Sequence, residues 1–363
     1  MLRLLLAPFA WLYGAVLLLR HALYDQGFLR RSGTRIPSIG VGNLALGGTG
    51  KTPHVELVLR TLEGIAPIAT LSRGYGRKAN DIREVRGDDG PAQVGDEPLL
   101  LKKKFPAVRV WVGADRVAAL EKMVETVPAL QAVVLDDAFQ HRRMDAGLDI
   151  LLTTWHRPWH RDALLPAGRL RDLPARARFA DVVIVTKSPA LPAQADQLRW
   201  REELGLRPGQ PLFFSGITYG ELRVEGTGRV EAGPDDTQPS SFNSQPATAL
   251  NILLTTGIAD PAPLVDHLRS RCATLDHAAF PDHHAFTPDD LRGLAARYAN
   301  FATGPKVLVT TEKDAMRLLP MVAGSPLEGL PLAVIPMKAL ILNEPERFAA
   351  LIRDHVATHP ADR

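Results

Sequence analysis

Residues that would indicate a disulfide-stabilised, zinc-binding or nucleic-acid-binding protein are scarce in this chain. Its 363 residues include a single cysteine, Cys272, which excludes an intramolecular disulfide and permits a reducing compartment. Neither zinc-finger spacing nor the aromatic signature of RNA-reading modules occurs, and the net charge is only +3. We therefore expect no nucleic acid among the partners, whereas this weakly basic balance suits anionic lipid or phosphate.

Charge is also absent from a long stretch near the N-terminus. The sixteen residues from Leu4 to Leu19 lie between Arg3 and Arg20 and carry no charge. As a helix this run would extend about 24 Å, less than the ~30 Å hydrocarbon core of a bilayer. We expect residues 1–28 to form a helix that inserts at the membrane interface, because amphipathic and basic residues accompany the run. These residues are Trp11, Tyr13, Arg20, His21, Arg30 and Arg31.

Two other interpretations of the N-terminal run are open. It could be a buried core helix, or it could be a cleaved signal peptide. No small-x-small cleavage site follows the run before Arg20, which disfavours the signal peptide.

The most informative segment runs from Ala45 to Thr52 and ends in Gly-Lys-Thr after an apolar run. This ending is typical of a phosphate-binding loop, in which glycines let backbone N–H groups converge on the phosphates. The lysine neutralises the β- and γ-phosphate oxygens, and the threonine hydroxyl reaches Mg²⁺. We expect a nucleoside triphosphate to bind at Ala45, Leu46, Gly47, Gly48, Thr49, Gly50, Lys51 and Thr52. Ala45 departs from the strict pattern, which has glycine at that position.

A dinucleotide-binding fingerprint overlaps this loop. Gly40, Gly42 and Ala45 match its spacing, and Glu63 lies roughly 20 residues further on, where a ribose partner would stand. In that fold the helix would begin near Gly42 and would contain the later glycines of the loop, each at a cost of about 1 kcal/mol. The phosphate-loop interpretation avoids this cost.

Short apolar runs alternate with helix-like segments along the chain. The first set comprises strands at 36–41, 65–71, 108–112, 132–135, 150–153 and 182–185, with helices at 53–62, 98–104 and 115–124. A second set comprises strands at 249–255, 306–310 and 332–335, with helices at 262–269 and 291–298. This alternation predicts an α/β fold of the P-loop NTPase type, with a largely parallel sheet and helices on both faces, followed by a smaller α/β domain.

The expected domain boundaries follow from these two sets. We expect a P-loop domain over residues 29–212 and a smaller C-terminal α/β domain over residues 213–363. Residues 226–248 are rich in glycine, proline and serine and contain scarcely any large apolar residue, which predicts a flexible insertion.

Two carboxylates end the apolar strand expected at 132–135. Asp136 and Asp137 stand there as in a Walker B strand, and the carboxyl edge of a parallel sheet is also where a phosphate loop lies. We expect them to bind Mg²⁺ together with Thr52, although they could instead cap the following helix. The next residues that could contact a substrate from this edge are Gln140, His141, Arg142 and Arg143.

Arginines suited to an anionic substrate occur in three further places. The planar guanidinium group binds phosphate through two parallel hydrogen bonds. The candidates are Arg73, Tyr75 and Arg77 in a glycine-containing loop, Arg116 at a helix start, and Arg169 and Arg171 in the segment 165–172. A solvated turn is the alternative for residues 72–77, and the three lysines at 102–104 are expected to form a solvated helix face.

Two acids at another helix start provide a candidate base. Asp96 and Glu97 follow Gly95 and precede Pro98, a pattern that is also typical of N-capping. We expect Asp96 to accept a proton from a substrate hydroxyl, and Glu97 to be a further metal ligand. Far along the chain, His283 and His284 lack the Cys or Glu spacing of a zinc site, so we expect an acid–base partner there.

In this order the motifs resemble those of the tetraacyldisaccharide 4'-kinase family, the lipid A 4'-kinases of Gram-negative bacteria. The resemblance covers nearly the whole chain. It is carried by the apolar N-terminus and by residues 42–52, 72–77, 95–98, 135–142, 165–172, 282–284 and 311–314. The family is not strictly glycine at the position of Ala45, and Asp172 stands where glutamate is expected in many relatives.

The resemblance implies an ATP-dependent kinase that phosphorylates the 4'-hydroxyl of a tetraacyl glucosamine disaccharide 1-phosphate. It implies Mg²⁺, a lipid A precursor and the membrane surface as partners, no obligate protein partner, and a location at the cytoplasmic face of the inner membrane. Lys51 would bind the phosphates, Asp96 would be the base and His283 its partner. A histidine in the second domain paired with a base in the first would couple domain closure to proton transfer.

One alternative function stays open from the sequence. A membrane-associated regulatory P-loop NTPase would share the phosphate loop and the metal-binding acids, but it would not transfer phosphate to a lipid. Transfer of label from ATP to lipid, rather than to free phosphate alone, distinguishes the two.

Overall fold

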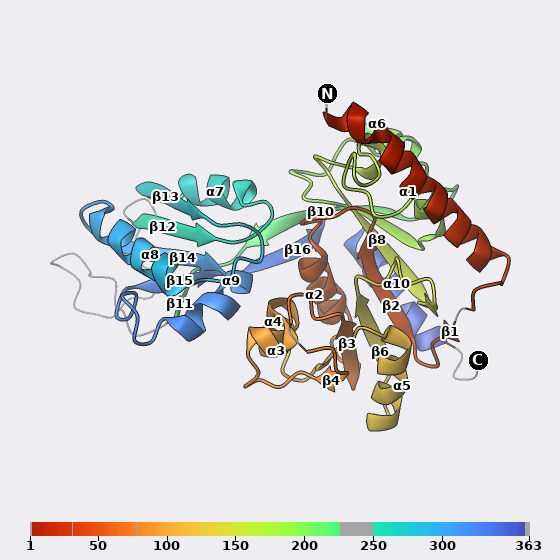
Figure 1. Ribbon diagram of the computed structural model, residues 1–363, viewed down its shortest axis with the longest axis horizontal. Coiled ribbons are helices and arrows are strands. Elements are labelled where there is room, and N and C mark those ends of the chain that lie inside the picture. Colours follow the sequence, from red (N-terminus) through yellow and green to blue (C-terminus); the bar gives the residue numbers. More distant parts are fainter. Residues whose placement is uncertain (1, 31, 78, 226–249, 360–363) are drawn as a thin grey trace. The chain divides into compact units, whose positions relative to one another are not determined.

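The computed structural model describes residues 2–30, 32–77, 79–225 and 250–359 (Figure 1). Arg31 and the insertion predicted at 226–248 lie outside these ranges. The chain forms two compact units, of which the first comprises Met1–Asp89, Leu101–Thr218 and Ala339–Arg363, and the second comprises Gly90–Leu100 and Tyr219–Lys338. Relative to the boundaries expected from the sequence, residues 90–100 belong to the second unit and residues 339–363 return to the first.

The first unit is built on a nine-stranded sheet. Its strands are β2 (Ser38–Asn43), β3 (Ile68–Ser72), β4 (Arg83–Glu84), β5 (Arg109–Val112), β6 (Ala132–Asp136), β8 (Leu148–Thr154), β9 (Val182–Thr186), β10 (Leu212–Tyr219) and β16 (Met337–Ile341). Their order is β16-β10-β9-β8-β2-β6-β3-β5-β4. The pairings from β10 through β5 are parallel, and β4 runs antiparallel to β5. The largely parallel sheet predicted from the sequence is confirmed.

Helices alternate with the strands of the first unit. They are α2 (Lys51–Thr61), α4 (Asp96–Lys104), α5 (Arg116–Thr126), α6 (Gln194–Glu203) and α10 (Pro345–Thr358), with 3-10 turns η1 (Trp159–Arg161) and η2 (Pro174–Phe179). One of them, α4, has its residues 96–100 in the second unit and the rest in the first. A short parallel pair, β1 (Ser32–Gly33) with β7 (Met144–Asp145), stands apart from the main sheet.

Strand β6 shows why the core strands are continuous apolar runs. Val133 and Leu135 pack in one apolar cluster with Met123 of α5. Ala132 and Val134, which alternation directs to the opposite face, are fully buried as well. The sheet is therefore covered on both faces, and no polar position is available along the strand before the acids at its end.

The second unit repeats the α/β principle on a smaller scale. Its five-stranded sheet has the order β11-β15-β14-β12-β13, parallel apart from the antiparallel pairing of β11 with β15. The strands are β11 (Arg223–Glu225), β12 (Asn251–Thr256), β13 (Thr274–Ala279), β14 (Lys306–Thr311) and β15 (Leu332–Ile335). The helices are α3 (Pro91–Val94), α7 (Ala262–Arg269), α8 (Pro288–Asn300) and α9 (Glu312–Leu318), with the 3-10 turn η4 (Leu319–Met321).

The N-terminal segment forms one helix, α1 (Leu2–Asp25), shown in red in Figure 1. Several large apolar residues of this helix face outward and are exposed to solvent. The exposed fraction is 75% for Trp11 and 72% for Leu5. By length and composition Leu5–Asp25 could cross a membrane, although signal sequences and core helices pass the same test. Only 22% of the most apolar 18-residue stretch of this helix is buried in the protein, which argues against the core-helix alternative.

The opposite face of α1 packs on the protein. Ala10, Gly14, Leu17 and His21 are buried and follow the spacing of one helical stripe. His21 was expected in an exposed basic flank; instead its Nε2 lies 2.6 Å from Asp172 Oδ1. Burial lowers the pKa of His21, against the opposing effect of the aspartate.

Three further hydrogen bonds attach the helix. The Tyr13 hydroxyl, predicted as an interface anchor, donates to the Arg171 carbonyl at 2.8 Å. Arg142 donates to the His21 carbonyl at 3.0 Å and to Asp25 Oδ1 at 2.6 Å. The spacing of residues along the helix places these side chains on the face that packs on the protein and Trp11 on the opposite face. The sequence alone did not show which face would pack.

Candidate active site

The expected phosphate loop leads from β2 into α2. Gly47 and Gly50 have left-handed backbone conformations, with φ of 93° and 85°, which residues with side chains rarely adopt. The helix begins at Lys51, and its N-cap residue Gly50 brings no side chain to the first N–H groups. Free N–H groups at a helix N-terminus, together with the positive end of the helix dipole, are suited to binding an anion. Because the helix begins at Lys51 rather than near Gly42, the dinucleotide interpretation is excluded.

Side chains from neighbouring segments hold the loop in place. Asn43 Nδ2 donates to the Ala45 carbonyl at 2.6 Å and to Thr49 Oγ1 at 2.8 Å. Thr186 Oγ1, at the end of β9, donates to the Thr49 carbonyl at 2.8 Å. The peptide groups of the loop are thereby oriented by contacts within the first unit.

Asp137, directly after β6, lies among cationic side chains. Arg171 contacts both of its carboxylate oxygens, at 3.0 and 2.7 Å, and Lys51 Nζ lies 3.8 Å from one of them. Burial opposes ionisation, but the Arg171 hydrogen bonds and the charges of Lys51, Arg171 and Arg116 outweigh it and lower the pKa of Asp137. Its backbone is left-handed, with φ of 55°, and such strain is found at functional sites. The structure thus brings together three predicted site residues.

Oxygen ligands suitable for Mg²⁺ are present at this end of the sheet. Protein sites commonly hold the ion by one or two carboxylates together with substrate phosphates, so the Thr52 hydroxyl with Asp136 or Asp137 fits it. Within the described ranges, no group of three or more His, Cys, Asp or Glu residues is placed to hold a metal ion. Glu97 belongs to the second unit, where its Oε1 lies 3.0 Å from Lys313 Nζ; its metal role stays a prediction.

In the loop at 72–77, which is predicted to bind substrate, some side chains are exposed and others are held by contacts within the protein. Tyr75 is 68% exposed and Arg73 is also exposed. Arg77 donates to the Asp81 carbonyl at 2.7 Å, so its guanidinium group stabilises the segment that follows the loop. Arg73 and Tyr75 are therefore the members that a ligand can reach directly.

The remaining predicted substrate residues lie deeper in the first unit. Arg116 is 3% exposed and donates to the Gly113 carbonyl at 2.7 Å, and burial lowers its pKa against the opposing acids that end β6. Gln140 donates to the Asn43 carbonyl at the base of the phosphate loop. Burial, followed by the charge of Arg116, lowers the pKa of His141 and so favours the neutral imidazole.

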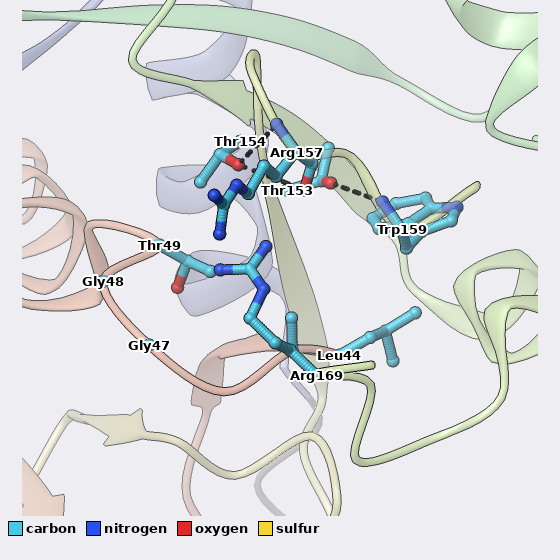
Figure 2. A pocket seen from close by; sticks show the side chains of 10 residues that line it. Leu44, Gly47, Gly48, Thr49, Thr153, Thr154, Arg157, Trp159 and Arg169 are labelled. Carbon is cyan, nitrogen blue, oxygen red and sulfur yellow. Dashed lines mark hydrogen bonds between the residues drawn. The ribbon is translucent and has the colours of Figure 1, made fainter. Parts of the chain in front are cut away.

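A pocket lies beside the phosphate loop (Figure 2). It is lined by Leu44, Ala45, Gly47, Gly48, Thr49, Thr153, Thr154, Arg157, Trp159 and Arg169. Figure 2 shows the guanidinium groups of Arg157 and Arg169 pointing toward the Thr49 side of the loop. Arg169 was predicted from the sequence as a candidate for an anionic substrate, whereas Arg157 was not. The feature that could have indicated Arg157 is its position shortly after β8, because β8 pairs with β2, the strand that leads into the phosphate loop.

His54 connects the start of α2 to a neighbouring strand. Its Nδ1 lies 2.7 Å from the Gly50 carbonyl and its Nε2 lies 2.8 Å from Ser215 Oγ. A carbonyl can only accept, so Nδ1 carries the proton and Nε2 accepts from the serine. Burial lowers the pKa of His54 to about 4.

The burial of His54 predicts a loss of stability in mild acid. Between its ordinary pKa of 6.5 and its folded pKa of about 4, the unfolded chain binds a proton that the folded chain does not. The free energy of unfolding should therefore fall as pH decreases, by on the order of 2 kcal/mol between pH 7 and pH 5 from this group. Urea titrations of the wild type and His54→Gln at both pH values measure it; equal pH dependence in the two proteins would contradict the assignment.

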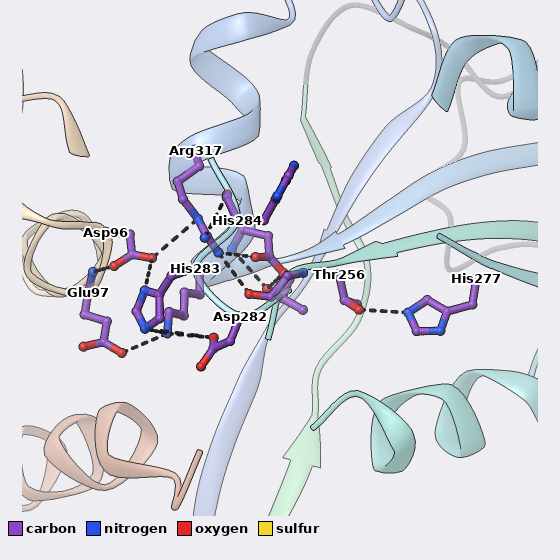
Figure 3. Close-up of polar contacts among 12 residues, drawn as sticks. Asp96, Glu97, Thr256, His277, Asp282, His283, His284 and Arg317 are labelled. Carbon is purple, nitrogen blue, oxygen red and sulfur yellow. Dashed lines mark hydrogen bonds and ion pairs between the residues drawn. The ribbon is translucent and has the colours of Figure 1, made fainter. Parts of the chain in front are cut away.

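The second unit contains the predicted base and its histidine partner (Figure 3). His283 Nδ1 lies 3.2 Å from Asp96 Oδ2, although 187 positions separate them in sequence. Burial raises the pKa of Asp96, but its His283 hydrogen bond and the charges of Lys313, His283 and Arg317 outweigh burial and lower it. Asp96 is thus a buried carboxylate that stays ionised.

Lys313 joins this group on the far side of the imidazole. Its Nζ lies 3.0 Å from His283 Nε2 and 3.0 Å from Glu97 Oε1. Burial opposes its charge, but the carboxylates of Glu97, Asp96 and Asp282 raise the pKa of Lys313. Lys313 was not predicted as a site residue, although it lies in the segment 311–314, which is one of those that carry the resemblance.

The Asp96–His283 contact corrects one expectation about domain closure. We expected the base in the first domain and the histidine in the second, so that closure would form the pair. Both residues belong to the second unit, because residues 90–100 pack with it. The pair is therefore formed within one unit and does not report closure. His284, its neighbour in sequence, instead pairs with Asp290 at 2.9 Å.

Comparison with known proteins identifies the family. The family model described as Tetraacyldisaccharide-1-P 4'-kinase matches residues 2–357. The chain belongs to this family.

Members of the tetraacyldisaccharide-1-P 4'-kinase family with similar sequences come from several bacteria. The Tetraacyldisaccharide 4'-kinase of Bacteroides thetaiotaomicron is 40% identical over 318 residues, with 86% of this chain and 82% of that protein covered. The protein of the same name from Parabacteroides distasonis is 38% identical over 361 residues, with 98% and 95% covered. The chain is accordingly a kinase of this family.

A solved structure of the family has the same fold. The LpxK protein of Aquifex aeolicus, crystallised in complex with ATP, superposes with a TM-score of 0.71 at 27% identity. The match covers 98% of this chain and all of that protein. The fold predicted from the sequence is therefore confirmed by an experimentally determined relative.

Proposed function

We propose that this kinase transfers the γ-phosphoryl group of ATP to the 4'-hydroxyl of a tetraacyl glucosamine disaccharide 1-phosphate in lipid A biosynthesis. The observation that carries the proposal is the family match along the whole chain, together with a phosphate loop and a buried Asp–His pair. The names of the relatives and the ATP complex of the Aquifex protein support the donor and the acceptor.

The donor side is assigned to the first unit. The N–H groups at 46–52 would bind the phosphates, Lys51 would neutralise their oxygens, and the pocket arginines Arg157 and Arg169 would add positive charge. Thr52 with Asp136 or Asp137 would hold Mg²⁺, which supplies charge neutralisation on the phosphates when bound.

The acceptor side is assigned to Asp96. Its carboxylate Oδ2 would accept the proton of the 4'-hydroxyl as the oxygen attacks the γ-phosphorus, while His283 holds the carboxylate in position. Arg73 and Tyr75, with Arg116, Gln140, His141 and Arg171, are proposed to contact the sugar and its phosphate. Positioning and charge neutralisation would supply most of the rate in such a transfer.

We also propose that the kinase acts at a membrane surface. The apolar outer side of α1 and its exposed Trp11 suit the interfacial region of a bilayer, whereas the inner side is attached to the first unit through His21 and Tyr13. A helix held in this way would keep the enzyme beside a substrate whose acyl chains stay in the bilayer. The cytoplasmic face is the side on which ATP is available.

A label-transfer assay tests the function. The purified protein is incubated with γ-labelled ATP, Mg²⁺ and tetraacyldisaccharide 1-phosphate in mixed micelles, and lipid and free phosphate are separated. We expect the label in the lipid, with stoichiometric ADP formation. Label found only in free phosphate would instead support the regulatory NTPase.

A further inference from the structure

The inner face of α1 contacts the segments that surround the phosphate loop. The Tyr13 hydroxyl donates to the main-chain carbonyl of Arg171 at 2.8 Å, and Arg20 Nη2 donates to that of Gln140 at 3.0 Å. Positions 13 and 20 are about two helical turns apart, so both side chains lie on one side of the helix. The helix therefore holds the main chain of two residues that were predicted as part of the site.

The main chain of Arg171 is held from two directions. Its N–H donates to the Leu44 carbonyl at 2.7 Å, and its C=O accepts from Tyr13 of α1. Leu44 directly follows β2, so the first of these hydrogen bonds connects Arg171 to the strand that leads into the phosphate loop. The position of the Arg171 backbone thus depends on α1 as well as on the sheet.

The side chains of Arg171 and Gln140 converge on Asn43, the last residue of β2. Arg171 Nη2 donates to Asn43 Oδ1 at 2.6 Å and to Asp137 Oδ1 at 2.7 Å, and Gln140 Nε2 donates to the Asn43 carbonyl. A guanidinium group can only donate, so it keeps the amide oxygen of Asn43 on its own side. The amide nitrogen then faces the loop, where it donates to the Ala45 carbonyl.

His21 and Asp172 form a second contact between α1 and the same segment. Arg142 Nη1 lies 3.2 Å from His21 Nδ1. Because a guanidinium group has only donors, Nδ1 accepts, and the proton of the imidazole lies on Nε2, which donates to Asp172 Oδ1 at 2.6 Å. The same Oδ1 accepts from Leu173 N at 2.8 Å. Since Asp172 is only 1% exposed, water cannot replace this contact, which fixes the residue next to Arg171.

We propose that Tyr13 and His21 are positioning residues that act through Arg171. By holding residues 171 and 172, they keep the Arg171 guanidinium group on Asn43 and so keep the phosphate loop oriented for a nucleotide. The helix that is proposed to lie at the membrane is thereby also a support of the nucleotide site. The effect on nucleotide affinity rests on the function proposed above, whereas the coupling between α1 and the loop does not.

A helix that serves only as an anchor is the competing explanation. In that case the inner-face hydrogen bonds attach α1, and losing one changes stability or membrane binding but leaves nucleotide affinity unchanged. A double-mutant cycle separates the two explanations. Arg171→Met removes the guanidinium group but keeps the main-chain carbonyl to which Tyr13 donates. If Tyr13 acts through that guanidinium group, Tyr13→Phe has little further effect on nucleotide affinity in the Arg171→Met protein.

Equilibrium binding of a fluorescent, non-hydrolysable ATP analogue with Mg²⁺ measures the cycle, using the full-length protein in detergent micelles without lipid substrate. We expect Tyr13→Phe to raise the Kd about threefold to tenfold when Arg171 is present, as the loss of one hydrogen bond can do, and less than about twofold in Arg171→Met. Tyr298→Phe is the matched control, because it removes a hydroxyl that donates to a main-chain carbonyl at 2.8 Å in the second unit. It should leave the Kd unchanged.

Substitutions of His21 test the second contact. His21→Leu removes the donor to Asp172 and should weaken binding of the analogue by at least as much as Tyr13→Phe, because it leaves a buried carboxyl group without that partner. His21→Gln carries a side-chain amide that can donate from near the position of Nε2, and it should recover most of the loss. The Tyr13 cycle decides even if His21→Leu does not fold.

Urea titrations of the four proteins of the cycle, without nucleotide, give a reading that does not depend on the proposed function. We expect Tyr13→Phe to lower the urea midpoint less in Arg171→Met than in the wild type. An unchanged Kd in Tyr13→Phe, or equal effects of Tyr13→Phe with and without the guanidinium group, overturns the proposal. Coupled urea midpoints in a protein that does not bind the analogue would support the coupling and reject the proposed function alone.

Discussion

Replacing Asp96 by asparagine is expected to lower turnover by about 10²–10⁴-fold, because an amide cannot accept the proton of the attacking hydroxyl. The side chain keeps its shape, and the oxygen that accepts from Glu97 N at 2.9 Å is retained. The KM for ATP should change little, since the residues proposed to bind ATP all belong to the first unit. Steady-state kinetics with varied ATP and varied lipid measure both effects.

A matched control separates this effect from general damage to the second unit. Asp289→Asn makes the same change at an exposed aspartate at the start of α8, whose surface ion pair contributes little to stability. It should leave turnover unchanged. Near-normal turnover in Asp96→Asn and in Asp96→Ala would remove Asp96 from the role of base.

Replacing Lys51 by methionine is expected to lower turnover by about 10²–10³-fold, the usual loss when one preorganised charge or donor at a transition state is removed. Lys51 is the first residue of α2, next to the N–H groups that are proposed to bind phosphate. Its 3.8 Å contact with Asp137 would be lost as well, which leaves the carboxylate to Arg171. Affinity for ATP should weaken together with kcat.

Equilibrium binding of a fluorescent ATP analogue and label transfer to lipid measure the two consequences of Lys51→Met separately. Lys103→Met is the control, because it changes an exposed lysine of α4 that belongs to the first unit. Full activity in Lys51→Met would show that the loop does not hold the transferred phosphate.

Most of the interior strands could be predicted because burial on both faces makes them continuous apolar runs. Val182–Thr186 was expected at 182–185, and Ala132–Asp136 at 132–135. Of the strands longer than three residues in the described ranges, β10, β13 and β16 were not predicted. β13 and β16 lie at sheet edges, whereas β10 lies between β16 and β9. β13 reads Thr-Leu-Asp-His-Ala-Ala and is largely half-exposed, so its pattern does not differ from that of a loop.

The donor side of the candidate site could be predicted more completely than the acceptor side. Backbone conformations at Gly47 and Gly50 are local requirements, so the order of residue types specifies the loop. The contacts of Asp137 with Arg171, 34 positions apart, depend on which strands are neighbours and were not predicted. Tertiary packing also decides that residues 90–100 belong to the second unit. For this reason the sequence placed the expected base, Asp96, in the wrong unit.

By itself the sequence determined the phosphate loop, the α/β alternation, the apolar N-terminus and the resemblance to a kinase family, because each depends on neighbouring residues or on short-range periodicity. Only the tertiary structure decided which face of α1 packs on the protein, that Arg171 pairs with Asp137, and that Lys313 and Asp96 contact opposite nitrogens of His283. Such contacts join residues far apart in the chain. Their donors and acceptors can be assigned only when the fold has placed them within hydrogen-bond distance.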